Sequence, residues 1–171
     1  MKIWVICVAF GLTTYMHAIE RYAYFGDLHV HTRFSMDAFA FGTRATPDDA
    51  YRFACGAEIR HPEGYAVQLD QPLDFYAVTD HAEYLGGLTT LSNPNHPLYR
   101  TATQLGILDE STVVERGRSH PDAGSFVAEN ITQRELRDAW RHVVDAARRH
   151  YEPGEFTTFI GYEYTSFRDA G

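Results

Sequence analysis

Three short apolar segments, separated by two helix signals, restrict the fold of this chain more than any other feature. Residues 22–25, 75–79 and 156–160 are rich in aromatic and apolar side chains, and such segments favour strands. Strands that alternate with helices are typical of parallel sheets joined by right-handed crossovers. The order of the segments therefore predicts an α/β fold built on a parallel sheet.

Two helices are predicted between these strands. The first begins at Thr46, with Pro47 in its first turn, and the second begins at a capping box formed by Thr132 and Glu135. Apolar residues recur at helical spacing in both helices, which indicates that one side of each is buried. These residues are Ala50, Phe53, Ala54 and Ala57 in the first helix and Leu136, Ala139, Trp140, Val143, Val144, Ala147 and Tyr151 in the second.

The remaining segments carry weaker signals. Residues 61–71 combine proline, glycine and partial alternation, which predicts a small hairpin. Residues 86–131 show little periodicity apart from a helix around residues 98–105, and we interpret them as an insertion over the strand ends. Cys55 is predicted to be a small buried residue within the first helix.

Composition and the amino terminus indicate an exported globular protein. The formal net charge of −8 argues against a nucleic-acid partner. Lys2 precedes an apolar run that is too short to span a bilayer, which predicts a signal peptide over residues 1–18. The competing interpretation of this run is a first buried strand. We expect a periplasmic or extracellular protein without a stable membrane anchor.

Each predicted strand leads into residue types that bind metal ions. His29 and His31 follow the first strand, Asp80 and His81 follow the second, and Glu163 follows the third. Because the carboxyl ends of parallel strands meet at one edge of a sheet, we expect these side chains to converge there. Imidazole and carboxylate groups together suit Zn²⁺, Mn²⁺ or Fe²⁺.

Ordinary structural roles compete with this interpretation. The chain has nine histidines, so a single His-x-His pair can arise by chance, Asp80 could cap a turn, and Glu163 could be a solvated charge. Polar ends on three consecutive apolar strands favour the metal site instead. Asp37 lies in a loop that could fold over the same edge. His142 and His150 lie beside the apolar stripe of the second helix, and we predict surface or packing roles for both.

The sequence around these residues resembles the PHP superfamily, named for polymerase and histidinol phosphatase. Residues 27–32 (DLHVHT), 78–81 (VTDH) and 161–163 (GYE) are similar to its first three motifs. The similarity extends from about residue 22 to residue 165 and is greatest to an exported bacterial branch. It implies that residues 22–171 are the amino-terminal portion of a distorted seven-stranded β/α barrel that holds up to three divalent ions.

The resemblance also implies a role for each polar strand end. His29, His31 and Glu163 would bind the first ion, and Glu163 would bridge to a second. Asp37 and His81 would hold a third. The implied reaction is hydrolysis of a phosphate ester, or alternatively a sulfate ester, by metal-activated water. The implied substrate is therefore a small anionic ester.

Four further residues are predicted to support this site. The resemblance implies that Asp27 and Asp80 orient the histidines without binding the ions themselves. Arg33 and Arg44 could contact the anionic group of the substrate, since a guanidinium suits phosphate and sulfate oxygens. The alternative role for each arginine is a salt bridge within a loop.

The motifs present here cover only part of the superfamily pattern. Members continue with a further histidine motif and a later Asp-x-His, and three strands do not close a barrel of seven. We therefore expect a fragment that lacks the carboxy-terminal part of the barrel, with weak metal binding and little turnover. A non-catalytic exported protein that binds a metal or ligand is the alternative. A metal-dependent amide hydrolase on a related barrel is disfavoured, because such sites usually need a bridging lysine and Lys2 is the only lysine.

Overall fold

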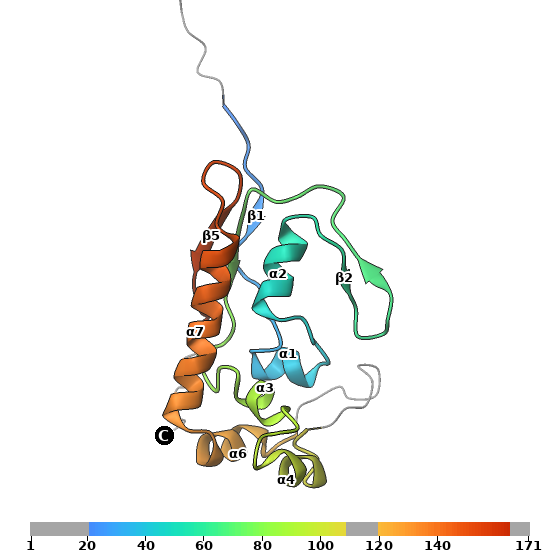
Figure 1. Cartoon of the computed structure of the whole chain (residues 1–171), viewed down its shortest axis with the longest axis vertical. Coiled ribbons are helices and arrows are strands. Elements are labelled where there is room, and N and C mark those ends of the chain that lie inside the picture. The colour runs from blue at the N-terminus through green and yellow to red at the C-terminus, as the bar shows by residue number, and fades with distance from the viewer. Residues whose placement is uncertain (1–20, 109–119, 165–171) are drawn as a thin grey trace, which may run out of the picture.

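The computed structural model describes residues 21–108 and 120–164, which form a mixed α/β fold around a parallel three-stranded sheet (Figure 1). The strands are β1 (Gly26–Asp27), β4 (Phe75–Val78) and β5 (Thr157–Ile160). β4 lies in the centre and pairs in parallel with both neighbours. This pairing confirms the parallel α/β fold predicted from the order of the segments.

The first strand is shorter and begins later than predicted. β4 and β5 fall within the predicted segments, but residues 22–25 are exposed and lie outside any strand. β1 begins instead at Gly26, where a Cβ atom would overlap the carbonyl oxygen and ring of Phe75. The close approach of these two strands therefore requires glycine. Residues 22–25 were wrongly predicted to lie in the strand, although the Phe25 carbonyl accepts a hydrogen bond from the Asp74 amide at 2.7 Å.

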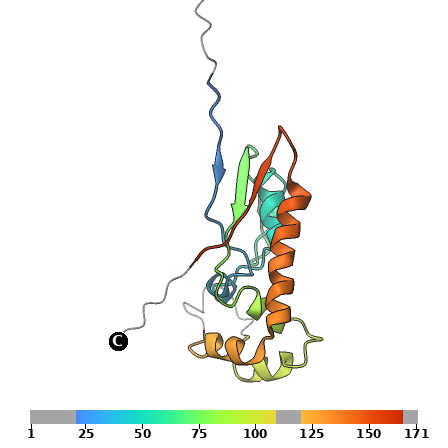
Figure 2. The ribbon, with the colours of Figure 1, turned by 90° about the vertical axis from the view of Figure 1, so that its left-hand side faces the viewer.

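One face of the sheet is covered by α2 (Pro47–Ala54) and α7 (Gln133–His150), as Figure 2 shows. On the other face, Phe75 and Phe159 meet edge to face with ring centroids 6.3 Å apart. Phe159 is 47% exposed, and no described element lies over it. The buried cluster between the helices and the sheet consists of Ala50, Tyr51, Ala54, Tyr76, Val78, Ala146, Ala147 and Phe156.

Both helices begin as the sequence predicts. The Thr46 hydroxyl accepts a hydrogen bond from the Asp49 amide, and the Asp49 carboxylate accepts one from the Thr46 amide. The same reciprocal pair joins Thr132 and Glu135 at the start of α7. Capping boxes of this kind satisfy amide groups that the first helical turn leaves without partners.

The ends of the helices differ from the prediction. α7 ends at His150, so Tyr151 lies beyond it and is 50% exposed. Cys55 follows the last residue of α2 and is exposed rather than buried. The next residue, Gly56, has a φ of +81°, which turns the chain away from the helix axis. This turn carries Cys55 out of the apolar side that buries Ala50 and Ala54.

A small hairpin follows α2, close to the predicted position. β2 (Ile59–Arg60) and β3 (Ala66–Val67) pair antiparallel. The rings of His61 and Tyr65 stack across the turn with centroids 4.3 Å apart. The hairpin is confirmed, although its first strand begins two residues before the predicted segment.

The segment interpreted as an irregular insertion is largely helical where it is described. It contains α3 (Gly87–Leu91), α4 (Tyr99–Gln104) and α6 (Ala123–Asn130), and only α4 was predicted. With α1 (Met36–Ala40), these helices lie towards the carboxyl ends of the strands (Figures 1 and 2). They enclose a second buried cluster of Phe39, Leu88, Leu91, Ala102, Ile107, Leu108, Ala123, Val127 and Ile131.

The predicted signal peptide, residues 1–18, lies outside the described residues. Within residues 21–108 and 120–164, no helix combines the length and apolar character needed to cross a bilayer.

Asp48 joins the two helices that cover the sheet. Its carboxylate accepts three hydrogen bonds of 2.7–3.1 Å from the Arg149 guanidinium. Nε2 of His150 and Nε2 of His142 lie 3.2 and 3.3 Å from its oxygens. These contacts are consistent with the predicted packing and surface roles of both histidines. Partial burial raises the pKa of Asp48, but the hydrogen bond and charge of Arg149 and the two imidazoles lower it overall.

We predict that Asp48→Asn lowers the free energy of unfolding by about 1 kcal/mol at pH 7, the scale of a bidentate but partly solvated ion pair. Because the pKa of Asp48 is depressed in the folded state, its stabilising effect is present above the ordinary value of about 4. It is lost as the pH falls through the depressed value. Urea unfolding at several pH values measures the difference.

The matched control is Asp138→Asn on α7, which removes an exposed pair with Arg141 of 2.9 Å and should change stability by less than about 0.5 kcal/mol. The role assigned to Asp48 would be contradicted if both substitutions lowered the free energy of unfolding equally. It would also be contradicted if the loss caused by Asp48→Asn did not become smaller at acidic pH.

Candidate metal centre

Backbone hydrogen bonds extend the strand alignment beyond the ends of β1, β4 and β5. The amide of Thr79 donates to the carbonyl of Val30 at 2.8 Å, and the Thr79 hydroxyl accepts from the Val30 amide at 3.0 Å. His81 forms an isolated parallel bridge with Glu163. The three polar strand ends therefore lie side by side, although His29 and His31 are in an extended segment and not in a strand.

His29 and His31 both approach one carboxylate oxygen of Glu163. Their Nε2 atoms lie 3.0 and 2.7 Å from Oε2, and the two ring centroids are 5.1 Å apart. The His29 side chain is 72% exposed, whereas that of His31 is 19% exposed. These three side chains form the first group of convergent metal-ligating atoms.

His31, Asp37 and His81 form a second group that overlaps the first. Nε2 of His81 lies 3.4 Å from Oδ2 of Asp37, and Nδ1 of His31 lies 3.7 Å from Oδ1. The rings of His31 and His81 meet edge to face with centroids 4.5 Å apart. In each group the ligand atoms lie within 4.8 Å of one another, so α1 folds Asp37 over the edge as predicted.

The donor set fits one or two divalent cations. Ligand atoms bound at 2.0–2.1 Å in a tetrahedral shell lie about 3.4 Å apart, close to the spacing found here. A neutral imidazole has only one nitrogen that can ligate. His31 can therefore offer Nε2 to an ion shared with His29 and Glu163 while its Nδ1 keeps its proton on the side of Asp37.

The charge of Glu163 is favoured by its neighbours. Desolvation raises the pKa of this carboxyl, but the hydrogen bonds from His29 and His31 and the charges of His81 and His31 lower it below its ordinary value. The carboxylate is thus held in the anionic form that metal ligation requires.

Asp80 is buried and holds the loop that carries His31. Its carboxylate accepts hydrogen bonds from the amide and hydroxyl of Thr32, at 2.6 and 2.7 Å, and from the amide and hydroxyl of Ser35, at 3.1 and 2.8 Å. The Ser35 hydroxyl in turn accepts from the amide of His81 at 3.0 Å. Asp80 thus fixes the segments that carry His31 and His81 through Thr32 and Ser35, while its predicted role of orienting the histidines at a metal ion stays a prediction.

Thr32 and Ser35, which hold the loop of His31 to Asp80, were not predicted from the sequence. Both are fully buried, and a polar residue is buried at little cost only when its hydrogen bonds are satisfied. The pattern Thr-x-x-Ser directly after the His-x-His pair is the signal that could have found them.

Asp27 and the two arginines belong to neither group of convergent ligand atoms. Asp27 is exposed, and its carboxylate accepts from the amide of His29 at 2.9 Å. The guanidinium carbons of Arg33 and Arg44 lie 5.8 and 4.5 Å from the ring centre of Phe39. Asp37 and Phe39 are two residues apart and so project from opposite sides of α1. A contact of either arginine with substrate at the ions stays a prediction.

We predict that Asp80→Ala lowers the free energy of unfolding by roughly 3 kcal/mol, since it leaves the Thr32 amide and the hydroxyls of Thr32 and Ser35 without this acceptor, while the Ser35 amide keeps the Thr32 carbonyl at 3.1 Å. Asp27→Ala, which removes an exposed carboxylate near the same histidines, should cost less than about 0.5 kcal/mol. Chemical denaturation at neutral pH compares the two. A small effect of Asp80→Ala would show that the Thr32–Ser35 loop does not depend on this carboxylate.

Comparison with known proteins gives a family but no function. No curated protein and no solved structure matches the chain. Residues 18–171, which include the whole candidate metal centre, match the family described as "Protein of unknown function (DUF3604)". The chain therefore belongs to the DUF3604 family.

Proposed function

We propose that the chain holds divalent cations at the candidate metal centre and forms the amino-terminal portion of a PHP-type hydrolase of phosphate or sulfate esters. The observation that carries the proposal is the convergence of three imidazoles and two carboxylates, from His29 to Glu163, within 4.8 Å in two overlapping groups. Export to the periplasm or exterior is part of the same proposal.

The architecture of the sheet supports a partial β/α barrel. The strands are parallel, and among the described residues helices cover one of the two faces. Exposed aromatic residues such as Phe159 lie on the other face, where further strands of a barrel would enclose them. The ligand atoms lie at the carboxyl ends of the strands, the usual position of the active site in such folds.

The side chains of the two groups would bind different ions. His29, His31 and Glu163 would hold one ion, and His81 with Asp37 would hold another. Bound divalent ions supply Lewis-acid charge and activate water for attack on an ester. The Asp37 carboxylate, whose Oδ1 lies 3.7 Å from Nδ1 of His31, would favour a proton on that nitrogen and so leave Nε2 free to ligate. Asp80 would keep the two histidine segments in register.

The exposure of the site favours a second candidate, a metal- or ligand-binding protein without turnover. The His29 side chain is 72% exposed, and an open site does not exclude bulk water from the reacting groups. Catalysis by charge stabilisation is strongest where water is excluded. The described residues alone are therefore expected to support only slow hydrolysis.

Metal content and esterase activity test the two candidates together. After dialysis against chelator and reloading with Zn²⁺ or Mn²⁺, we expect elemental analysis to find at least one ion per chain. His31→Ala, which removes a member of both groups, should lower metal affinity by more than the roughly 10–100-fold that loss of an outer partner costs. His61→Ala, on the hairpin turn, is the matched control and should retain the metal.

Activity is then measured on p-nitrophenyl phosphate, bis(p-nitrophenyl) phosphate and p-nitrophenyl sulfate. Slow hydrolysis that requires metal and His31 supports the hydrolase. Retained metal without turnover of any ester supports the non-catalytic candidate. A wild-type chain that retains no more metal than His31→Ala would overturn both.

A further inference from the structure

Two hollows outside the candidate metal centre lie between the loop that follows α1 and the β2–β3 hairpin. Two adjoining pockets of about 370 and 380 Å³ open here, each within the size range of small-molecule sites. They share five lining residues, Arg44, Ala45, Ile59, Arg60 and Pro62. A ligand could therefore occupy both pockets at once.

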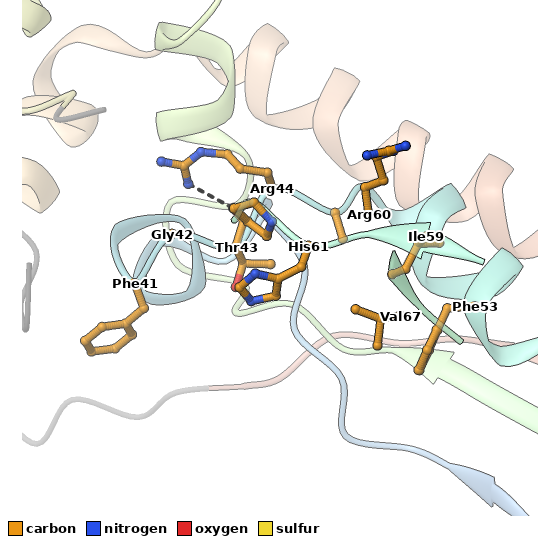
Figure 3. Close-up of a pocket in the computed structure, with 11 residues that line it drawn as sticks. Phe41, Gly42, Thr43, Arg44, Phe53, Ile59, Arg60, His61 and Val67 are labelled. Carbon is orange, nitrogen blue, oxygen red and sulfur yellow. Dashed lines mark hydrogen bonds between the residues drawn. The ribbon is translucent and has the colours of Figure 1, made fainter. Parts of the chain in front are cut away.

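The first pocket is mainly apolar. Phe41, Phe53, Ile59 and Val67 line it (Figure 3). Phe53 and Val67 are only partly buried, so their side chains have apolar surface to offer a ligand. Figure 3 shows Phe53 and Val67 close together, whereas Phe41 lies at the other end of the pocket.

The second pocket is lined by charged side chains. Arg44, Arg52 and Arg60 contribute three guanidinium groups, against the carboxylates of Asp49 and Glu58. Asp49 is already engaged, because its carboxylate accepts from Thr46 in the capping box and lies 3.4 Å from Arg52. The three guanidinium groups outnumber the two carboxylates, so the lining of this pocket carries a net positive charge that suits an anion.

Two of the arginines are presented in different ways. Nη1 of Arg44 donates to the carbonyls of Phe39 and Thr43 at 2.8 and 2.9 Å, which fixes the guanidinium over the Phe39 ring. Arg60 is exposed, and its Nη1 donates to the carbonyl of Gly64 at 3.1 Å. In Figure 3 both guanidinium groups lie on the side opposite Phe53 and Val67. Charge and apolar surface are thus separated across the site.

The site is distinct from the candidate metal centre. None of its lining residues belongs to either group of metal-ligating side chains. Arg44 stacks on Phe39, and α1 places Asp37 on its other side. A ligand bound here therefore need not contact a metal ion.

We propose that these two pockets bind a small amphiphilic anion, an alkyl or aryl chain that ends in a carboxylate, sulfate or phosphate. The apolar chain lies along Phe53 and Val67, and the anionic end meets Arg60. Guanidinium groups recognise all three anionic ends through paired hydrogen bonds. Because the alkyl chain would be buried in the apolar pocket, the affinity for the ligand should rise with the length of that chain.

Calorimetric titration of the full chain in chelator, with no metal present, tests the site independently of the proposed function. Octyl sulfate below its micelle concentration should bind saturably. Shortening the alkyl chain should weaken binding by about three- to fourfold per methylene. Octyltrimethylammonium, with the same chain and the opposite charge, should not bind. Arg60→Gln should weaken octyl sulfate binding about tenfold.

Arg134→Gln is the matched control, because the Arg134 side chain is 86% exposed on α7 and far in sequence from the hairpin. The circular dichroism spectrum of the Arg134→Gln protein and its affinity for octyl sulfate should equal those of the wild type. Binding that ignores chain length, that accepts the cationic ligand or that is unchanged in a folded Arg60→Gln protein would overturn the proposal. Binding to phosphatidylglycerol vesicles without binding to the monomeric amphiphile would also overturn it.

Discussion

The buried carboxylate of Asp80 is the interaction on which the rest of the candidate metal centre depends. It accepts four hydrogen bonds from Thr32 and Ser35, and so ties the end of β4 to the loop that follows β1. A carboxylate that is 1% exposed is stable in the fold only when such donors surround it. His31 and His81 are attached directly to the residues that this network fixes, and their spacing follows from it.

The positions of the strand ends could be predicted because the residue types at these ends and the parallel order of the strands both point to one edge of the sheet. A short apolar strand followed by histidine or carboxylate needs no knowledge of distant contacts, and parallel strands bring such ends to one edge. The convergence of His29, His31, His81 and Glu163 is therefore confirmed, whereas occupancy by metal stays a prediction. The start of β1 was missed because it depends on the contact of Gly26 with Phe75, which is far away in the sequence.

The helical segment after the second motif was difficult to predict for a different reason. α3 and α6 have five and eight residues, which is too short for a helical period to emerge from the sequence or for a helix to be stable alone. They are held by burial of Leu88, Leu91 and Val127 in a common cluster. Cys55 and Tyr151 were misplaced because each lies one residue beyond a helix end, where the apolar period no longer applies.

The central claim is that three imidazoles and two carboxylates share divalent cations at the carboxyl ends of the strands. Crystals grown with Zn²⁺ or Mn²⁺, with diffraction recorded at the absorption edge of the metal, test this directly. We expect an anomalous peak about 2.0–2.2 Å from Nε2 of His29 and His31 and from a Glu163 oxygen. A saturated crystal whose only anomalous peaks lie away from these side chains would contradict the account.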